Sequence, residues 1–442
     1  MNKTRRSKKR LWINTTLSLA SLVLILVAIQ GLNIISNWRE IIVSSSLLKI
    51  LSYPLLICFG VLILGMTFRG SLWLKYKPDT WKNSDPVELP FISVVMPAFN
   101  EEKDVGKAVE AIMSSDYPEN KLELICVDDG STDQTWEILN ELRRKYSGNL
   151  KIVSLKRNRG KRKALYQGIK KARGEIIVTT DADSQIQRRA LRNLILPLLR
   201  DNRVGAVAGK VAVLNERRNL ITRMLTAQYA LAFDFGRAYQ SVYGGVLCCP
   251  GALSAFRREA IDRVIRAWVK QKFLKVACNH GEDRALTNLV LKKGYLVKYQ
   301  ANAVVYTRVP EKIRQVNRMY LRWTRGSIRE SWLFARYLLM PRKKKYYLLP
   351  AVDFFFQLML HPLHLMVIAL LIYSFLMKPD FIFPQLIFLL ILAFALSLNN
   401  WKIMKSFKFI YTIPQALFTF FFQWWLVPYA VITIKDQNWL TK

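Results

Sequence analysis

Long apolar runs occupy both ends of the chain, and a segment with a different pattern separates them. The runs cover residues 11–31, 48–67, 347–376, 381–398 and 409–434. Each reaches or exceeds about the length, roughly 20 residues, that an α-helix needs to cross the hydrocarbon core of a bilayer. We therefore expect about five membrane-spanning helices, two at the start of the chain and three at its end.

The middle of the chain, residues 68–345, alternates short apolar stretches with polar loops and amphipathic stretches. The apolar stretches that predict strands are "FISVVM", "LELICV", "KIVSL", "EIIVTT" and "VGAVAGKVAV". Amphipathic stretches between them predict helices, as from Val105 to Met113 and in "QTWEILNELRRKY". This alternation favours an α/β fold with a mainly parallel sheet, in which ligands bind at the carboxyl ends of the strands.

The charge of the chain agrees with a membrane location. The chain carries 67 Lys and Arg against 31 Asp and Glu, a formal net charge of +36, and 52% of its residues are hydrophobic. Anionic lipid attracts basic residues beside spanning helices, whereas an equally basic soluble chain would point to nucleic acid. The apolar runs favour the lipid bilayer as partner and argue against nucleic acid.

The basic residues also predict an orientation. Six of them precede the first run, which places the amino terminus and the middle of the chain in the cytoplasm. A secretory signal is the alternative for that run, but its length and the second run that follows favour a retained helix. The five cysteines and three histidines lack the spacing of a zinc site, and their number and placement argue against a disulfide framework.

Acidic residues gather directly after two of the predicted strands. Asp128, Asp129 and Asp133 follow one strand, and Asp181 and Asp183 follow another. Taken singly, each group could simply turn the chain and cap the next helix. Two acidic loops at adjacent strand ends, however, repel each other unless a cation or hydrogen-bond donors compensate. A divalent ion such as Mg²⁺ or Mn²⁺ is the economical explanation, because it shares its coordination between carboxylates, phosphate and water.

A basic loop lies nearby in the sequence. In "NRGKRKA", Arg159, Lys161, Arg162 and Lys163 surround Gly160 at the predicted start of a helix. The amino terminus of a helix favours anions, so the loop could bind phosphate. A solvated surface loop is the alternative. Together with the acidic loops, the basic loop favours a nucleoside diphosphate as the ligand.

An ordered set of motifs extends this interpretation. The stretches "VVMPAFNEE", "VDDGSTD", "GKRKAL", "DADS", "GEDRALT" and "LRW" occur in this order between the apolar runs. Over roughly residues 90–335 the chain resembles the processive inverting glycosyltransferases of family 2, of the hyaluronan synthase, chitin synthase and poly-N-acetylglucosamine synthase type. The resemblance implies a GT-A type nucleotide-sugar-binding domain between transmembrane helices, a UDP-sugar donor, and Mg²⁺ or Mn²⁺ as cofactor.

The resemblance assigns the reaction to four residues. Asp283 would be the general base and Glu282 would shape its surroundings, whereas Arg322 and Trp323 would cover the diphosphate and the acceptor. Inverting transfer needs a carboxylate to take the proton of the attacking hydroxyl, and positive charge to stabilise the departing diphosphate. The alternative for "GEDRALTNLVLKKG" is a capped amphipathic helix without a catalytic role.

The resemblance also assigns the donor and metal sites. Asp181 and Asp183 match the D-x-D motif that holds the metal, with Asp183 the better candidate for direct coordination. Asp129 would contact the uracil side of the donor. The residues implied in nucleotide binding are Pro97, Asn100, Glu101, Asp129, Lys161, Asp181 and Arg284.

One position departs from the family pattern. The motif Q-x-x-R-W has Gln where this chain has Met319, which cannot donate the hydrogen bond of an amide. Either Arg318 substitutes from the preceding position or the contact is absent, which leaves processivity open. The surrounding stretch 318–340 mixes Arg with Trp, Tyr, Leu and Phe, which favours a helix in the headgroup region over one packed only on the domain.

These expectations divide the chain into a basic amino terminus with two spanning helices (1–67), a cytoplasmic GT-A domain (68–310), interfacial amphipathic helices (311–346) and about three spanning helices (347–442). The expected activity is inverting transfer of a sugar, with N-acetylglucosamine favoured, from a UDP-sugar to a growing polysaccharide that leaves through the spans. One alternative is a non-processive transferase that adds a single sugar to a lipid or small acceptor. Another is a non-catalytic, membrane-tethered protein that binds a polyanion.

Overall fold

The computed structural model describes residues 46–82, 88–338, 348–377 and 382–436. The chain forms two compact units. Unit 1 comprises Met1–Phe68 and Val352–Trp425, and unit 2 comprises Arg69–Ala351 and Leu426–Lys442. The first expected span, at residues 11–31, lies outside the described residues.

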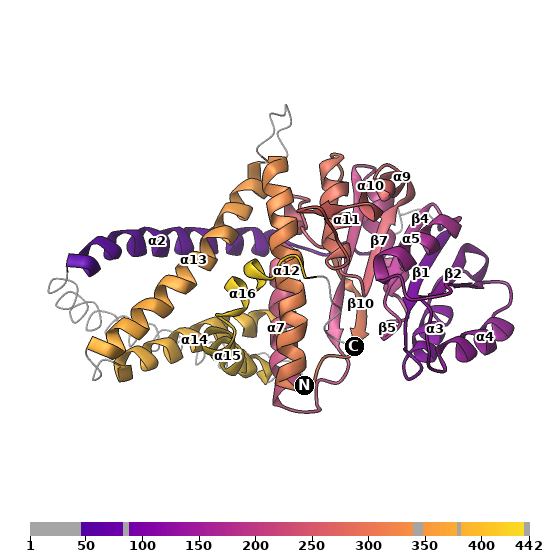
Figure 1. Ribbon diagram of the computed structural model, residues 1–442. Helices are drawn as coiled ribbons and strands as arrows, with labels where there is room; N and C mark the ends of the chain where they lie inside the picture. The colour runs from indigo at the N-terminus through magenta and orange to yellow at the C-terminus, as the bar shows by residue number, and fades with distance from the viewer. Residues whose placement is uncertain (1–45, 83–87, 339–347, 378–381, 437–442) are drawn as a thin grey trace, which may run out of the picture. The chain divides into compact units, whose positions relative to one another are not determined.

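Unit 2 contains an eight-stranded sheet in the order β3-β2-β1-β4-β7-β6-β10-β5 (Figure 1). Its strands are β1 (Ile92–Ala98), β2 (Leu122–Asp128), β3 (Leu150–Ser154), β4 (Ile176–Thr180), β5 (Ser184–Ile186), β6 (Val204–Val213), β7 (Leu253–Arg257) and β10 (Leu296–Thr307). Neighbouring strands from β3 to β4 are parallel, as are β6 and β10, whereas β7 and β5 run antiparallel to their neighbours. The predicted α/β fold with a mainly parallel sheet is confirmed.

Helices connect the strands and cover the sheet. They are α3 (Val105–Met113), η1 (Glu119–Lys121), α4 (Thr135–Lys145), α5 (Lys161–Lys171), α6 (Ala190–Arg200), α7 (Leu220–Ala230), the π-helix η2 (Leu231–Arg237), α8 (Ala238–Val242), α9 (Arg258–Asp262), α10 (Ile265–Val269) and α11 (Glu282–Lys292), with a hairpin of β8 (Lys272–Phe273) and β9 (Val276–Ala277) before α11. α3 has the predicted bounds, because Val105, Ala108, Val109 and Ile112 bury one helical face. α5 packs on β1 and β2, and α6 packs on β6 and β10.

The arrangement of the first strands corrects one expectation. β1 lies between β2 and β4, so the two acidic loops are not at adjacent strand ends. The chain winds outward from β1 to one side and later returns to the other, as in doubly wound sheets. Both loops nevertheless leave the same edge of the sheet, because β1, β2 and β4 run in the same direction. The end of β1 therefore lies between the two acidic loops.

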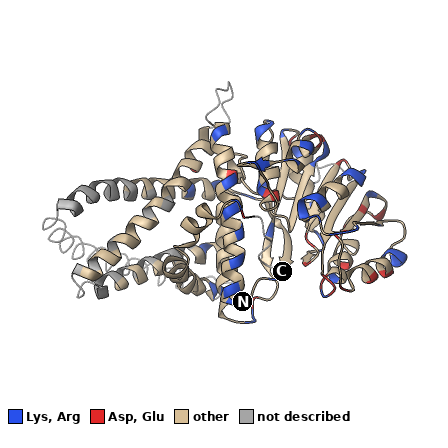
Figure 2. Cartoon of the chain, in the orientation of Figure 1, with Lys and Arg blue, Asp and Glu red and all other residues tan. Residues whose placement is uncertain are grey.

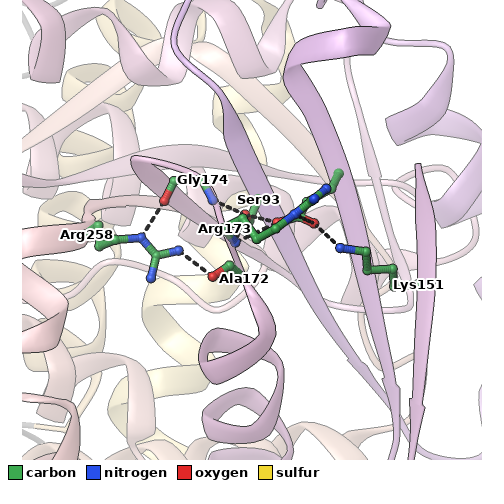
Figure 3. Close-up of polar contacts among 7 residues, drawn as sticks. Ser93, Lys151, Ala172, Arg173, Gly174 and Arg258 are labelled. Atoms are coloured by element: carbon green, nitrogen blue, oxygen red, sulfur yellow. Dashed lines mark hydrogen bonds and ion pairs between the residues drawn. The ribbon is translucent and has the colours of Figure 1, made fainter. Parts of the chain in front are cut away.

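A buried carboxylate links these strands at their starting ends, which lie opposite the acidic loops. Glu123, near the start of β2, is 1% exposed. It accepts hydrogen bonds from Ser93 Oγ at 2.6 Å, Lys151 Nζ at 2.8 Å and the Arg173 backbone N at 2.7 Å (Figure 3). The Arg258 guanidinium fixes the same loop by donating to the carbonyl oxygens of Ala172 and Gly174 (Figure 3). The loop between α5 and β4 is thus held from two sides.

We expect Glu123→Gln to lower the free energy of unfolding by about 1–3 kcal/mol, because the amide replaces an acceptor of several donors with a group that itself donates. Burial opposes ionisation of Glu123, but the bonds from Lys151 and Ser93 hold its pKa below the ordinary 4.5. The carboxylate therefore stabilises the fold above that pH, and its contribution disappears as the pH falls through the lowered pKa. Unfolding midpoints at pH 7 and in acid, with the exposed Glu119→Gln as control, test this. Equal midpoints for the two variants at pH 7 would contradict it.

A long amphipathic helix, α12 (Ile313–Leu338), follows the sheet, and its basic residues recur along its length (Figure 2). One face packs on α11 and on α16 (Leu426–Ile432). Arg325 on this face donates to Thr433 Oγ1 and forms an ion pair with Asp436 at 3.0 Å. Trp332, two turns beyond Arg325, is 61% accessible. Packing on the domain thus accounts for one face of α12, and the interfacial position of the other stays a prediction.

The expected membrane spans correspond to helices α2 (Ser46–Lys75), α13 (Leu348–Met377), α14 (Ile382–Met404), η5 (Phe407–Tyr411), α15 (Thr412–Phe422) and α16. Among the described residues, one helical stretch, Leu348–Tyr373, is long and apolar enough to cross a membrane. Phe407–Phe422 and Leu426–Ile432 pass the same test only as a pair across a break, so the run expected at 409–434 is interrupted. α2 continues past the expected boundary at residue 67 to Lys75. The count of five spans stays a prediction.

Candidate active site

The loop after β1 is bonded to the loop after β2. The backbone N–H of Asn100 donates to Ser131 Oγ at 3.0 Å, and that of Glu101 donates to Thr135 Oγ1 at 2.7 Å. Asn100 adopts a left-handed conformation with φ of 55°, which Asn tolerates better than most residues. Pro97 is buried inside β1. The two loops that contain the first two predicted motifs are therefore held together at the edge of the sheet.

Asp129 joins these two loops to the basic loop. Its two carboxylate oxygens accept hydrogen bonds from the backbone N–H groups of Arg159 and Gly160, each at 2.8 Å. Burial raises the pKa of Asp129 above its ordinary value, although these two bonds oppose the shift. Asp133, the residue of this cluster that was considered as a helix cap, accepts from the Thr135 backbone N–H at 3.0 Å, although the N-cap position of α4 is held by Gln134. Asp129 thus fixes the loop that precedes α5.

Lys161, the first residue of α5, lies between two acidic groups from different parts of the chain. Its Nζ is 2.5 Å from Asp181 Oδ1 and 3.3 Å from Glu282 Oε1. Gly251 leaves room for this ammonium, since a Cβ there would lie 2.6 Å from Nζ. Burial opposes the charge on Lys161, but Asp181 and Glu282 outweigh it and raise the pKa of the amine. Lys161 therefore brings the D-x-D loop and the start of α11 together.

The two acidic residues that begin α11 have opposite electrostatic environments. Burial raises the pKa of Asp283, and the neighbouring charge of Glu282 raises it further. Burial also opposes ionisation of Glu282, but Lys161 holds the pKa of that carboxyl below its ordinary value. Asp283 Oδ2 accepts a hydrogen bond from Cys248 Sγ at 3.5 Å. Pairs whose pKa values are driven apart in this way suit acid and base roles, which is consistent with the base role that the sequence predicts for Asp283.

A pH dependence follows from these environments. A general base acts only when deprotonated, so a raised pKa at Asp283 should place the acid limb of kcat above the ordinary 3.8 of an aspartate. The Cys248 hydrogen bond lowers this pKa, so Cys248→Ala should move the limb to higher pH. The pH profile of kcat, with Cys126→Ala in β2 as control, measures the shift. A limb that does not move in Cys248→Ala would contradict this assignment.

α12 contributes an aromatic and a basic side chain. Trp323 is 42% exposed, with its ring edge-on to Tyr320 at 5.6 Å between centroids and 6.3 Å from Tyr229. Burial raises the pKa of Tyr229, Asp183 adds to the shift, and Arg322 opposes it. The charge of Arg322 also lowers the pKa of Glu282. Arg322 and Trp323 therefore lie close to the residues that were predicted to share the site with them.

Several predicted side chains face other partners. Arg284 was expected to bind nucleotide, but its guanidinium donates to Ser327 Oγ and to Ser331 Oγ, the latter at 2.9 Å. Arg162 was assigned to the anion-binding loop, but it is 4% exposed and donates to the Trp268 carbonyl oxygen at 3.0 Å. Both point into the protein because each belongs to a helix whose inner face packs on another element. Met319 is buried on α12, and the neighbouring Arg318 is exposed.

The D-x-D carboxylates fit a hard divalent cation. Asp183 Oδ1 accepts from Ser184 Oγ at 3.1 Å and from Thr307 Oγ1 at 3.4 Å, and Asp181 is paired with Lys161. Within the described residues, no group of three or more His, Cys, Asp or Glu side chains is arranged to hold a metal. Mg²⁺ and Mn²⁺ are commonly held by one or two carboxylates with substrate phosphates and water completing the shell. Two carboxylates are therefore an adequate protein donor set if the nucleotide brings its phosphates.

Three residues near the site were not among the predicted site residues. Cys248 contacts Asp283, Tyr229 lies against Trp323, and the Trp268 indole N–H donates to the Glu282 carbonyl oxygen at 2.7 Å. Cys248 belongs to "SVYGGVLCCPG", part of a stretch that resembles the acceptor-side segment of hyaluronan synthases, although no role was assigned to Cys248 itself. Tyr229 and Trp268 lie in amphipathic stretches, where an aromatic residue normally indicates packing.

Comparison with known proteins identifies the family of the chain. Residues 93–265 match the family Glycosyl transferase family 2. An N-acetylglucosaminyltransferase of Azorhizobium caulinodans is 31% identical over 367 residues, which cover 81% of this chain and 89% of that protein. A second, from Rhizobium meliloti, is 34% identical over 256 residues, 57% of this chain and 59% of its own length. The chain belongs to glycosyltransferase family 2, and the protein is a glycosyltransferase.

A solved structure shares the fold. A mannosyltransferase from Pyrobaculum calidifontis, determined in complex with GDP-mannose and Mn²⁺, superposes with a TM-score of 0.58 at 22% identity. The match covers 83% of this chain and 96% of that one. The α/β fold of unit 2 is therefore GT-A-like, as the resemblance implied.

Proposed function

We propose that the protein is an inverting β-N-acetylglucosaminyltransferase that takes its sugar from a UDP donor. The observation that carries this proposal is the position of Lys161 between Asp181 of the D-x-D motif and Glu282 beside Asp283. It supports a single crevice in which the donor phosphates and the acceptor hydroxyl meet. The two rhizobial relatives, both N-acetylglucosaminyltransferases, support the choice of donor sugar.

The proposed mechanism separates activation of the acceptor from stabilisation of the leaving group. Asp283 takes the proton of the acceptor hydroxyl as that oxygen attacks the anomeric carbon and the bond to the diphosphate breaks. Lys161 and Arg322 supply positive charge near the departing diphosphate, and Glu282 stays ionised because Lys161 is paired with it. Asp181 and Asp183 would hold Mg²⁺ or Mn²⁺, which when bound neutralises phosphate charge. No carboxylate is assigned to a covalent intermediate, so we expect inversion at the anomeric carbon.

The proposed acceptor is a growing polysaccharide. The exposed Trp323 and its neighbour Tyr320 offer aromatic faces of the kind on which sugar rings pack. We further propose that the chain is a multi-pass protein of the cell membrane, with unit 2 in the cytoplasm and the product exported through the spans. A non-processive transfer of one sugar to a lipid or small acceptor is the second candidate. It is favoured by Met319, whose buried thioether cannot replace the amide of the family motif.

Incubation of the purified protein with labelled UDP-N-acetylglucosamine, and with Mg²⁺ or Mn²⁺, tests both candidates. A ladder or high polymer on sizing supports elongation, whereas a single added sugar supports the non-processive candidate. UDP-glucuronate and GDP-mannose in parallel reactions test the donor. Release of nucleotide from either of these, with none from UDP-N-acetylglucosamine, would overturn the donor assignment.

A further inference from the structure

A buried polar network lies next to Glu282 and Asp283, which we call the catalytic pair, and Arg162 is its only member that the sequence singled out. It consists of Arg162, Trp268, Gln271, Asn288 and Glu330, which we call the Glu330 network. These residues come from α5, α10, the turn after α10, α11 and α12, respectively. Trp268 and Glu330 are each 1% exposed. Buried polar groups held by several partners specify how elements pack against one another.

Glu330 lies at the centre of the network. One carboxylate oxygen accepts from Gln271 Nε2 at 2.9 Å, and the other accepts from Asn288 Nδ2 at 3.3 Å. Asn288 Nδ2 also lies 3.2 Å from the Glu330 carbonyl oxygen. The neighbouring Arg329 contacts Glu330 Oε1 at 3.5 Å and donates to the His280 carbonyl oxygen. Glu330 therefore bonds α12 both to α11 and to the segment that leads into it.

The network continues from Glu330 to both sides of the active site. Gln271 Oε1 accepts from Arg162 Nη1 at 2.8 Å, and Arg162 directly follows Lys161 on α5. The Arg162 guanidinium also lies over the Trp268 ring, 5.4 Å from its centroid. Trp268 in turn donates to the Glu282 carbonyl oxygen. The backbone of the catalytic pair and the helix that carries Lys161 thus share one set of buried contacts with α12.

α12 touches the start of α11 directly at two glycines. A Cβ on Gly326 would lie 3.3 Å from the Gly281 Cα, and a Cβ on Gly281 would lie 3.2 Å from the Gly326 Cα. Gly281 has a φ of 68°, a conformation that suits glycine, and it directly precedes Glu282 and Asp283. No side chain lies between the two backbones. A displacement of α12 would therefore directly displace the start of α11 and the catalytic residues that it carries.

We propose that Glu330 is a positioning residue that sets the place of Asp283 relative to Lys161 by bonding α12 to α11 and, through Gln271 and Arg162, to α5. The inference rests on the proposed function in one respect, that Asp283 is the general base. Glu330 itself contacts neither donor nor acceptor in this scheme. Its loss should therefore lower kcat while the KM for the donor stays near the wild-type value.

Kinetics of nucleotide release over a range of donor concentrations, which give kcat and the donor KM separately, test this. Glu330→Ala should lower kcat about 10-fold to 100-fold, the size of effect expected when a reacting group is slightly misplaced. Glu330→Gln should lie between Ala and the wild type, because its amide oxygen can accept from Gln271 or from Asn288 but not from both. Gln271→Ala combined with Glu330→Ala should cost less than the product of the two single effects, since both remove the same link.

Glu123→Gln is the matched control, because Glu123 is an equally buried, multiply bonded carboxylate at the opposite end of the sheet. It should lower stability without lowering kcat. Hydrogen exchange provides a readout besides activity: Glu330→Ala should speed exchange of the backbone amides at the start of α11, and Glu123→Gln should not. Unchanged exchange at α11 in Glu330→Ala, or a kcat equal to that of Glu123→Gln, would overturn the inference. A wild-type protein that releases no nucleotide from any donor would count against the proposed function, and the exchange result would still decide the role of Glu330.

Discussion

Asp283→Asn protein should bind its donor but transfer sugar about 10²–10⁴-fold more slowly than the wild type, the range expected for loss of a general base. The amide fills the same space and can still accept from Cys248, but it cannot take the proton of the acceptor hydroxyl. The pKa of Asp283 is raised by burial and by Glu282, so this carboxyl is a stronger base than an ordinary aspartate. Stopped assays of UDP release at saturating donor measure the loss.

The control for this variant is Asp262→Asn, the same substitution at an exposed residue of α9. It should leave kcat unchanged. Binding of UDP, measured by calorimetry, should be alike in the wild type and in Asp283→Asn, because the base does not contact the nucleotide in the proposed scheme. Transfer at the wild-type rate in Asp283→Asn would remove this residue from the mechanism.

Asp183→Asn should lower transfer by at least about 100-fold, because the site would lose one of the two carboxylates available to the metal that neutralises the leaving group. The remaining member of the D-x-D motif, Asp181, is already paired with Lys161 at 2.5 Å and is a poorer ligand alone. The substitution keeps the size of the side chain and an oxygen that can accept from Ser184.

Binding of Mn²⁺ in the presence of UDP, followed by electron paramagnetic resonance, separates the metal site from the reaction. The Asp183→Asn protein should need a much higher Mn²⁺ concentration for half saturation than the wild type, and Asp262→Asn should match the wild type. Excess Mn²⁺ should restore part of the activity. Equal Mn²⁺ affinity in all three proteins would place the metal elsewhere or argue against it.

The elements that the sequence predicted well are those whose own residues determine them. The helix from Val105 to Met113 and the strand from Val204 to Val213 have the predicted bounds, because a periodic apolar face defines the helix and a continuous apolar run defines the strand. β5 was not predicted, since its three residues are too few to show a period, and it exists through pairing with β10. The place of β1 between the acidic loops was also missed, because strand order depends on how the chain crosses the sheet.

The candidate site shows the same division. The acidic and basic residues were found from their types and spacing, and Lys161 indeed meets Asp181. The partners of Asp129 could not be found in this way, because they are backbone N–H groups of a loop about thirty residues further along. The inward direction of Arg162 and Arg284 depends on which helix face is covered, and the covering residues, Trp268 and Ser327, lie far away in sequence. The partners of Asp129, Arg162 and Arg284 therefore depend on packing between segments far apart in the sequence, which composition and spacing do not reveal.

Unit 2 is built from two segments that are far apart in the sequence, Arg69–Ala351 and Leu426–Lys442. Thr433 and Asp436 bond the buried Arg325 of α12, although about a hundred residues separate them from it and unit 1 takes up most of that interval. During synthesis, Arg325 gains these partners only after the intervening helices have been made. Unit 2 therefore cannot complete these contacts before the intervening helices have been synthesised, and a substitution at Thr433 or Asp436 acts on α12, which lies far from it in the sequence.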